Sequence, residues 1–198
     1  MPIRLLVGLG NPGPRYADTR HNAGFWFADR LAADRGSAFR AESRFEGEVA
    51  RFAAGSANCL LQKPLTFMNK SGSAVQKLAA FYRIPPTEIL VVHDDLDLPA
   101  GTVRLKAGGG HGGHNGLRDL HRHLGADYAR LRIGIGHPGI REAVIGYVLE
   151  RPGREEEIAM RQAIDAALGI VDDLVGGDWD RAVRRLHSQA VPNGENEA

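Results

Sequence analysis

Short apolar runs of the kind that form β-strands alternate along this chain with stretches whose apolar residues recur at helical spacing. Chains with this alternation fold as a sheet with helices packed on its faces. We therefore expect an α/β fold, with a single domain over residues 1–187 built on a twisted mixed central β-sheet surrounded by α-helices, and a disordered tail over residues 188–198. The expected strands are 3–10, 47–53, 58–62, 88–92, 103–105 and 131–135, and the expected helices are one after Asn22 and those at 75–82, 117–124, 164–175 and 178–186. Helix-capping side chains are expected at Asn22 and Ser71, and a helix cap is the structural alternative for Asn115.

The size and composition of the chain fit one folded domain. With 198 residues, of which 43% are hydrophobic, it can bury a sizeable core. It has no run of about 20 apolar residues that could cross a membrane, and its start lacks the apolar segment of a secretory signal. Its one cysteine, Cys59, lies in an apolar strand-like run and is expected to be a buried structural thiol. These features predict a cytoplasmic protein that does not bind membranes.

The net charge of +1 is too small for a protein that coats nucleic acid, because such binding needs many cations on one surface. Any contact with RNA must therefore be local. Basic residues recur along one stretch, although an ordinary solvated surface would explain them equally well. They are Arg104, Lys106, Arg118, Arg122, Arg130 and Arg132.

The first strand runs into Gly8-Leu9-Gly10-Asn11-Pro12-Gly13, which has the glycine spacing of a dinucleotide-binding loop. In such loops the helix starts within the glycine run, so that its free N–H groups face the pyrophosphate. Here two prolines remove N–H donors, and the helical pattern begins only near Asn22. We therefore favour a tight loop that presents Asn11 and Tyr16 beside the sheet over a nucleotide-binding loop.

His21 lies in a polar segment just before the first helix, where a histidine can be either structural or catalytic. An imidazole with an ordinary pKa of about 6.5 can take a proton from water near neutral pH. It needs a carboxylate that accepts a hydrogen bond from one ring nitrogen and stabilises the imidazolium. The polar cluster after strand 88–92 offers Asp94 for this role, with Asp95 and Asp97 as alternatives.

The glycine-rich segment 108–114 carries His111 and His114. Together with the acidic cluster they could suggest a metal site, but their spacing matches no closed zinc motif. We expect instead a mobile loop whose backbone can approach a ligand. The loop 63–72 contains no nucleophile motif of the Gly-x-Ser-x-Gly type, and its Asn69 could hold a water or a carbonyl oxygen without bringing charge.

Several blocks of the sequence match one known family in both their order and their spacing. They are Gly8–Gly13 with Tyr16 and Thr19–Asn22, then Lys63–Pro64 with Met68–Asn69 and Ser71–Gly72, then His93–Pro99, Gly112–Leu117 and Arg132–Pro138. Together these blocks resemble the bacterial peptidyl-tRNA hydrolase family, and the resemblance extends from residue 3 to residue 187. Long blocks in register are more specific than any single motif.

The resemblance implies a monomeric esterase without cofactor or metal, which acts in translation and ribosome rescue by releasing peptides from tRNA. In the family pattern His21 matches the base that activates water, Asp94 the group that holds its basic form, and Asn11 the position that separates N-blocked from free aminoacyl-tRNA. Matches to tRNA- and substrate-contacting positions are Tyr16, Phe67, Asn69 and Asn115, with Met68 in the same crevice and His114 beside it. Lys106 and Arg132 match a pair that binds the 5′ phosphate of tRNA.

On this basis we expect His21 to take a proton from water while Asn69 and Asn115 position the water and the peptide carbonyl, without a covalent intermediate. Two other functions stay open. A relative of the family could have lost hydrolysis and act as an RNA-binding accessory protein, although the retained His21 and Asp94 argue against this. The other is the nucleotide-cofactor enzyme suggested by the glycine pattern.

Overall fold

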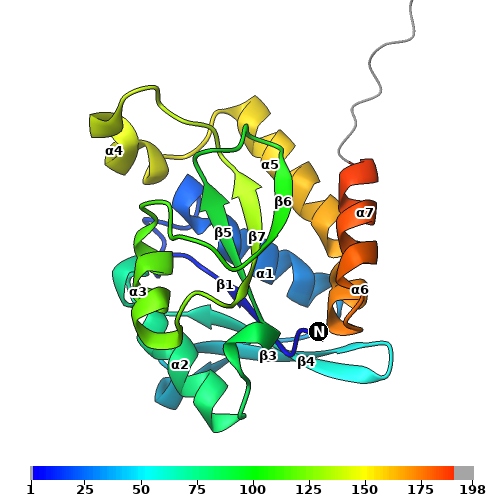
Figure 1. Ribbon diagram of the computed structural model, residues 1–198. Coiled ribbons are helices and arrows are strands. Elements are labelled where there is room, and N and C mark those ends of the chain that lie inside the picture. Colours follow the sequence, from blue (N-terminus) through cyan, green and yellow to red (C-terminus); the bar gives the residue numbers. More distant parts are fainter. Residues whose placement is uncertain (1, 190–198) are drawn as a thin grey trace, which may run out of the picture.

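The computed structural model describes residues 2–189, which fold around one mixed seven-stranded sheet (Figure 1). The strand order is β2-β3-β4-β1-β5-β7-β6. The four central strands run parallel, whereas β2, β3 and β6 are antiparallel to their neighbours. The strands are β1 Leu5–Gly8, β2 Arg40–Glu42, β3 Gly47–Ala54, β4 Ala57–Pro64, β5 Ile89–Asp95, β6 Val103–Ala107 and β7 Ala129–Gly134. The expected α/β fold with a mixed sheet is confirmed.

Helices cover both faces of the sheet because its central strands are buried on both sides. Along β1, Leu6 packs into one apolar cluster with α1, α5, α6 and α7, whereas Leu5 and Val7 pack into a second cluster with α2 and α3. Alternate side chains of a strand point to opposite faces, so a continuous apolar run feeds two cores. The helices of the described part are α1 Ala23–Asp34, α2 Ser71–Phe81, α3 Asn115–Leu124, α4 Val144–Val148, α5 Arg154–Leu168, α6 Val171–Val175 and α7 Trp179–Gln189. No helix among residues 2–189 is long and apolar enough to span a membrane.

The glycines of the first loop allow helix α1 to approach the sheet closely. A Cβ atom on Gly8 would clash with the backbone oxygen of Gly24, and one on Gly24 would clash with the backbone of Leu9 and Val92. Helix α1 therefore lies directly on the end of β1, where neither surface carries a side chain. This packing explains Gly8, and the Phe25 ring of α1 leaves no room for a Cβ on Gly10, whereas Gly13 has a φ of 98° that favours glycine.

The helix caps expected at Asn22 and Ser71 are wrong, and Asn115 is not a cap either. Asn22 precedes α1, but its side chain makes no capping hydrogen bond and binds the backbone of Asn11 instead. Ser71 is the first residue of α2, and its hydroxyl donates to the carbonyl of Met68. Asn115 is the first residue of α3, which is capped by the preceding residue, His114. Residue type alone did not show which partner each side chain meets in the folded chain.

Other boundaries also differ from expectation. The helix expected over 164–175 is two helices, α5 and α6, and strand β5 continues to Asp95 rather than ending at Val92. The short elements β2 and α4 were not anticipated. Helix α7 runs to Gln189, two residues past the expected end of the domain, while the rest of the tail, 190–198, lies outside the described residues.

Candidate active site

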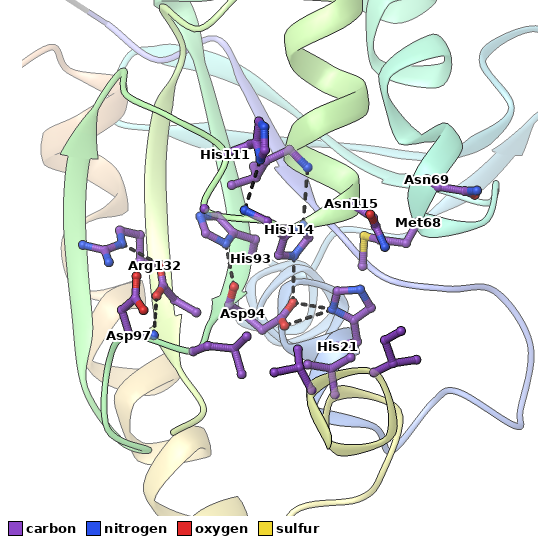
Figure 2. Close-up of a pocket in the computed structure, with 18 of the residues that line it drawn as sticks. His21, Met68, Asn69, His93, Asp94, Asp97, His111, His114, Asn115 and Arg132 are labelled. Carbon is purple, nitrogen blue, oxygen red and sulfur yellow. Dashed lines mark hydrogen bonds and ion pairs between the residues drawn. The ribbon is translucent and has the colours of Figure 1, made fainter. Parts of the chain in front are cut away.

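The carboxyl ends of the parallel strands meet at one edge of the sheet, where a pocket of about 800 Å³ opens. Chain segments that follow β1 and β4 reach this edge, as do the end of β5 and the start of α3 (Figure 2). Residues distant in sequence therefore converge here, as is usual for sites in α/β folds. The residues proposed from sequence that line the pocket are Asn11, His21, Phe67, Met68, Asn69, Asp94, Lys106, His114, Asn115 and Arg132.

His21 and Asp94 form a buried hydrogen-bonded pair. The Nδ1 atom of His21 lies 2.9 Å from each carboxylate oxygen of Asp94. An ionised carboxylate can only accept a hydrogen bond, so Nδ1 of the neutral imidazole carries the proton and donates it. Its Nε2 atom then carries a lone pair on the side of the ring away from Asp94, toward Met68 and Asn115 (Figure 2). This tautomer is the one that a general base requires.

The electrostatics of the pair reinforce this arrangement. Burial alone would lower the pKa of His21, but the negative charge of Asp94 and the hydrogen bond to it raise this pKa above its ordinary value. Burial alone would raise the pKa of Asp94, but the charge and hydrogen bonds of His21 and His114 hold it well below its usual range. The pair therefore consists of an ionised carboxylate and a basic imidazole.

Two further histidines surround Asp94. The Nε2 atom of His114 lies 2.9 Å from Oδ1 of Asp94, and the His114 ring contacts the ring of His21 at 4.8 Å between centroids. His93 is fully buried, and its Nδ1 lies 2.7 Å from the backbone oxygen of Asp94. Burial and the neighbouring His114 lower the pKa of His93 to about 3, so this ring is neutral near pH 7.

Asn11 links the first loop to the segment after β4. Its side-chain oxygen accepts a hydrogen bond of 2.8 Å from the backbone N–H of Met68, which is itself buried. The amide NH₂ of Asn11 is left as the group that can meet a ligand. The structure thus brings Asn11 and Met68 to the same wall of the pocket as His21.

The rim of the pocket is polar and aromatic. Asn69 and Asn115 line it with exposed side chains. The Phe67 ring, 57% exposed, meets the Tyr16 ring edge-on at 6.4 Å. Tyr16 lies outside the pocket lining and is brought to it only through Phe67. Exposed aromatic faces of this kind suit stacking of unpaired bases.

The other end of the pocket is cationic. Strand pairing places Lys106 directly opposite Arg130, and Arg104 directly opposite Arg132, so four cations project from the same face of β6 and β7. One carboxylate pairs with this group, because Nε of Arg132 donates to Asp95 at 2.7 Å. The Asp95 side chain is therefore directed to Arg132 and not to His21, and its Oδ1 also accepts from the backbone N–H of Asp97. Like charges directly opposite each other destabilise a sheet, which indicates a site for an anion.

The sequence pattern did not single out several residues of the pocket. Arg130, which is buried, binds the backbone oxygens of Gly109 and Gly110 and so fixes the glycine-rich loop. Helix α4 supplies an apolar wall that contains Val144 and Val148. Arg20 anchors this wall through the Tyr147 backbone oxygen at 3.1 Å. Because α4 has five residues, its pattern was too short to read.

Among the described residues, one group of side chains is of the types that bind metal ions and lies close enough together to do so. Nitrogen and oxygen atoms of His21, Asp94 and His114 lie within 4.8 Å of one another. These three residues already form the hydrogen bonds around Asp94. His111, which had been weighed as a ligand, is not in this group, and its Nδ1 accepts from the N–H of Gly113.

The comparisons with known proteins agree with one another. The family model for peptidyl-tRNA hydrolase matches residues 5–194. A peptidyl-tRNA hydrolase of Alkalilimnicola ehrlichii is 53% identical over 191 residues, covering 96% of this chain and 97% of that protein. One of Neisseria gonorrhoeae is 54% identical over 188 residues, covering 94% of this chain and 98% of that protein. The crystal structure of peptidyl-tRNA hydrolase from Acinetobacter baumannii matches with a TM-score of 0.91 and 48% identity, covering 93% of this chain and 94% of that chain.

Proposed function

This chain belongs to the peptidyl-tRNA hydrolase family and hydrolyses the ester between a peptide and the 3′ end of tRNA, and we propose that His21 is the general base of this reaction. The observation that carries the proposal is the hydrogen bond of 2.9 Å from Nδ1 of His21 to the carboxylate of Asp94. It leaves the Nε2 lone pair facing the pocket, where a water molecule can give up a proton. Asp94 fixes the tautomer and stabilises the imidazolium that forms.

The reaction needs no covalent intermediate. Nε2 of His21 takes a proton from water as the water oxygen attacks the ester carbonyl carbon. The C–O bond to the ribose then breaks, and the imidazolium returns the proton to the ribose oxygen. Asn69 and Asn115, neutral side chains at the rim of the pocket, are placed to hold the water and the carbonyl oxygen.

The remaining residues each bind a different part of the substrate. The side-chain oxygen of Asn11 accepts a hydrogen bond from the backbone N–H of Met68, so its amide NH₂ turns to the peptide and separates N-blocked from free aminoacyl-tRNA. Tyr16 and Phe67 stack on the unpaired bases of the acceptor end. Lys106 and Arg132 bind the 5′ phosphate at the cationic end of the pocket. We infer that the enzyme works in the cytoplasm as a monomer, without a cofactor.

The rival functions differ from this proposal in what they predict. A non-catalytic RNA-binding relative would bind peptidyl-tRNA without turnover. A nucleotide-cofactor enzyme would use the loop after β1, but the glycines there serve the packing of α1, whose first residue, Ala23, lies well beyond the glycine run. A shift in melting temperature with NAD or FAD would favour the cofactor enzyme.

The deciding experiment measures release of N-acetylated aminoacyl-tRNA by the purified protein and by His21→Ala. We expect turnover by the wild type and a loss of about 10² to 10⁴-fold in His21→Ala. His187→Ala, on the exposed side of α7, is the matched control and should keep wild-type activity. Wild-type protein with a chelator should also be unaffected. Activity of His21→Ala within a few-fold of wild type would overturn the assignment.

A further inference from the structure

His114 makes two kinds of hydrogen bond through the two nitrogens of its ring. Its Nδ1 lies 3.1 Å from the backbone nitrogen of Gly116 and 3.3 Å from that of Leu117, at the start of α3. Its Nε2 lies 2.9 Å from Oδ1 of Asp94. The imidazole therefore acts as the N-cap of α3 and as a neighbour of the catalytic carboxylate at the same time.

These partners fix the position of the proton on His114. A backbone N–H can only donate, so Nδ1 of His114 must carry the lone pair that accepts from Gly116 and Leu117. The proton of the neutral ring then resides on Nε2 and is donated to Asp94. The helix start thereby fixes Nδ1 of His114 as the acceptor and Nε2 as the donor to Asp94.

The three histidines around Asp94 do not all carry their proton on the same ring nitrogen. His93 has its Nδ1 at the Asp94 backbone oxygen, which can only accept, so this nitrogen carries the proton. Its Nε2 is buried and has no partner within the described residues. Of the three rings, His21 is the one whose lone pair both faces the pocket and belongs to an imidazole beside the carboxylate charge.

We propose that His114 is a positioning residue for the base: it fixes the Asp94 carboxylate and takes up part of its negative charge, so that His21 is less basic than beside Asp94 alone. This inference rests on the proposed role of His21. Asp94 accepts from two imidazoles, and a donor on one of its oxygens weakens the attraction of the carboxylate for a proton on His21. A base that is too strongly stabilised as imidazolium would be protonated, and idle, near neutral pH.

Other charged groups near the pair are accounted for. Asp95 follows Asp94 on β5 but is paired with Arg132 of β7. His93 is neutral, as argued above. The wall from α4 presents apolar side chains to the pocket, and Lys106 and His111 line its other end. The donation from His114 is therefore the interaction that adjusts Asp94 independently of His21.

Two substitutions separate the cap from the donor. In His114→Asn the amide oxygen occupies the place of Nδ1 and can cap α3, but nothing reaches Asp94. In His114→Gln the amide nitrogen occupies the place of Nε2 and can donate to Asp94, but the cap is lost. His123→Asn is the matched control, because His123 lies on the same helix and bonds to the backbone oxygen of Asp119, outside the pocket.

The measurement is the pH dependence of kcat/KM for N-acetylated aminoacyl-tRNA, whose acid limb reports the pKa of His21 in the free enzyme. We expect His114→Asn to move this limb upward by about one pH unit, which is a tenfold loss below the limb and little loss above it. His114→Gln should keep the limb in place and lower the melting temperature, and His123→Asn should leave the limb unchanged. NMR titration of the His21 ring in each free protein gives the same shift without turnover.

An unmoved limb in His114→Asn, or equal shifts in His114→Asn and His114→Gln, would overturn the inference, because a purely structural role would affect both variants alike. The proposed roles of His21 and His114 can fail separately. If His21→Ala remains active, the proposed base is wrong. If His21→Ala is inactive but the His21 titration is the same in His114→Asn as in wild type, only the role of His114 is wrong.

Discussion

The side chain of Asn22 pairs with both backbone groups of Asn11. Its Oδ1 accepts from the Asn11 N–H at 2.8 Å, and its Nδ2 donates to the Asn11 carbonyl at 3.0 Å. Asn22, which follows the proposed base His21, therefore holds the loop that contains Asn11. The side chain of Asn11 in turn contacts Met68. Two walls of the pocket are joined by one buried amide.

This pairing predicts a large loss of stability in Asn22→Ala. Asn22 is 1% exposed, and its removal leaves a buried N–H and a buried C=O without partners. Each such group costs about 1–3 kcal/mol, so the free energy of unfolding should fall by about 2–6 kcal/mol. Urea unfolding measures this, with Asn58→Ala, at an exposed position near the start of β4, as the control. A loss below about 0.5 kcal/mol, the range of surface substitutions, would show that the Asn11 loop is held by other contacts.

Asp94→Asn should lower kcat by about 10²-fold or more while the protein still folds. An amide NH₂ in place of the carboxylate favours the His21 tautomer with its proton on Nε2, which cannot take a proton from water. Single-turnover rates and the melting temperature separate the chemical effect from unfolding. Asp97→Asn is the control, because Asp97 approaches Asp95 and not His21. Equal rates for Asp94→Asn and wild type would remove Asp94 from the mechanism.

Activity should rise with pH through a value above 6.5. The Asp94 charge raises the pKa of His21 above its ordinary value, and the protonated ring cannot act as a base, so kcat/KM falls as the pH drops through the raised pKa. The raised pKa of His21 contributes to stability with the opposite dependence: this contribution is complete below the pKa of His21 in the unfolded chain and is lost as the pH rises through the folded value. A pH–rate profile read beside unfolding free energies at the same pH values tests both signs. An acid limb below pH 6.5 would contradict the expected effect of Asp94.

Lys106→Gln should weaken binding of the tRNA 5′ phosphate specifically. Lys106 is exposed and lies opposite Arg130, so its ammonium group is available to an anion. A hydrogen bond to a charged group contributes about 1.5–3 kcal/mol, so kcat/KM should fall about ten- to hundredfold on 5′-phosphorylated substrate. The same variant should act normally on substrate without the 5′ phosphate, and Arg122→Gln on α3 should act normally on both. Equal losses on the two substrates would assign Lys106 another role.

The strand and helix types, the mixed sheet and the turn between β3 and β4 were readable from the sequence because apolar periodicity reports burial directly. Cys59 was correctly expected to be buried, and burial raises the pKa of its thiol to about 12. The caps were not readable. Ser, Asn and His side chains have several possible partners, and which one they meet depends on chain segments far away in sequence.

The sequence by itself determined the order of elements, the glycines that let α1 approach β1, and the residue types of the site. The tertiary structure decided that the Asp94 side chain, and not that of Asp95 or Asp97, lies at His21, since alternate residues of β5 point to opposite faces and Asp95 is bound by Arg132, while Asp97 lies beyond the end of β5. It also decided that His114, which the sequence placed only beside the substrate crevice, bridges Asp94 and α3. Hydrogen-bond partners 20 and 73 residues apart are set by how the sheet and helices pack, which no local pattern contains.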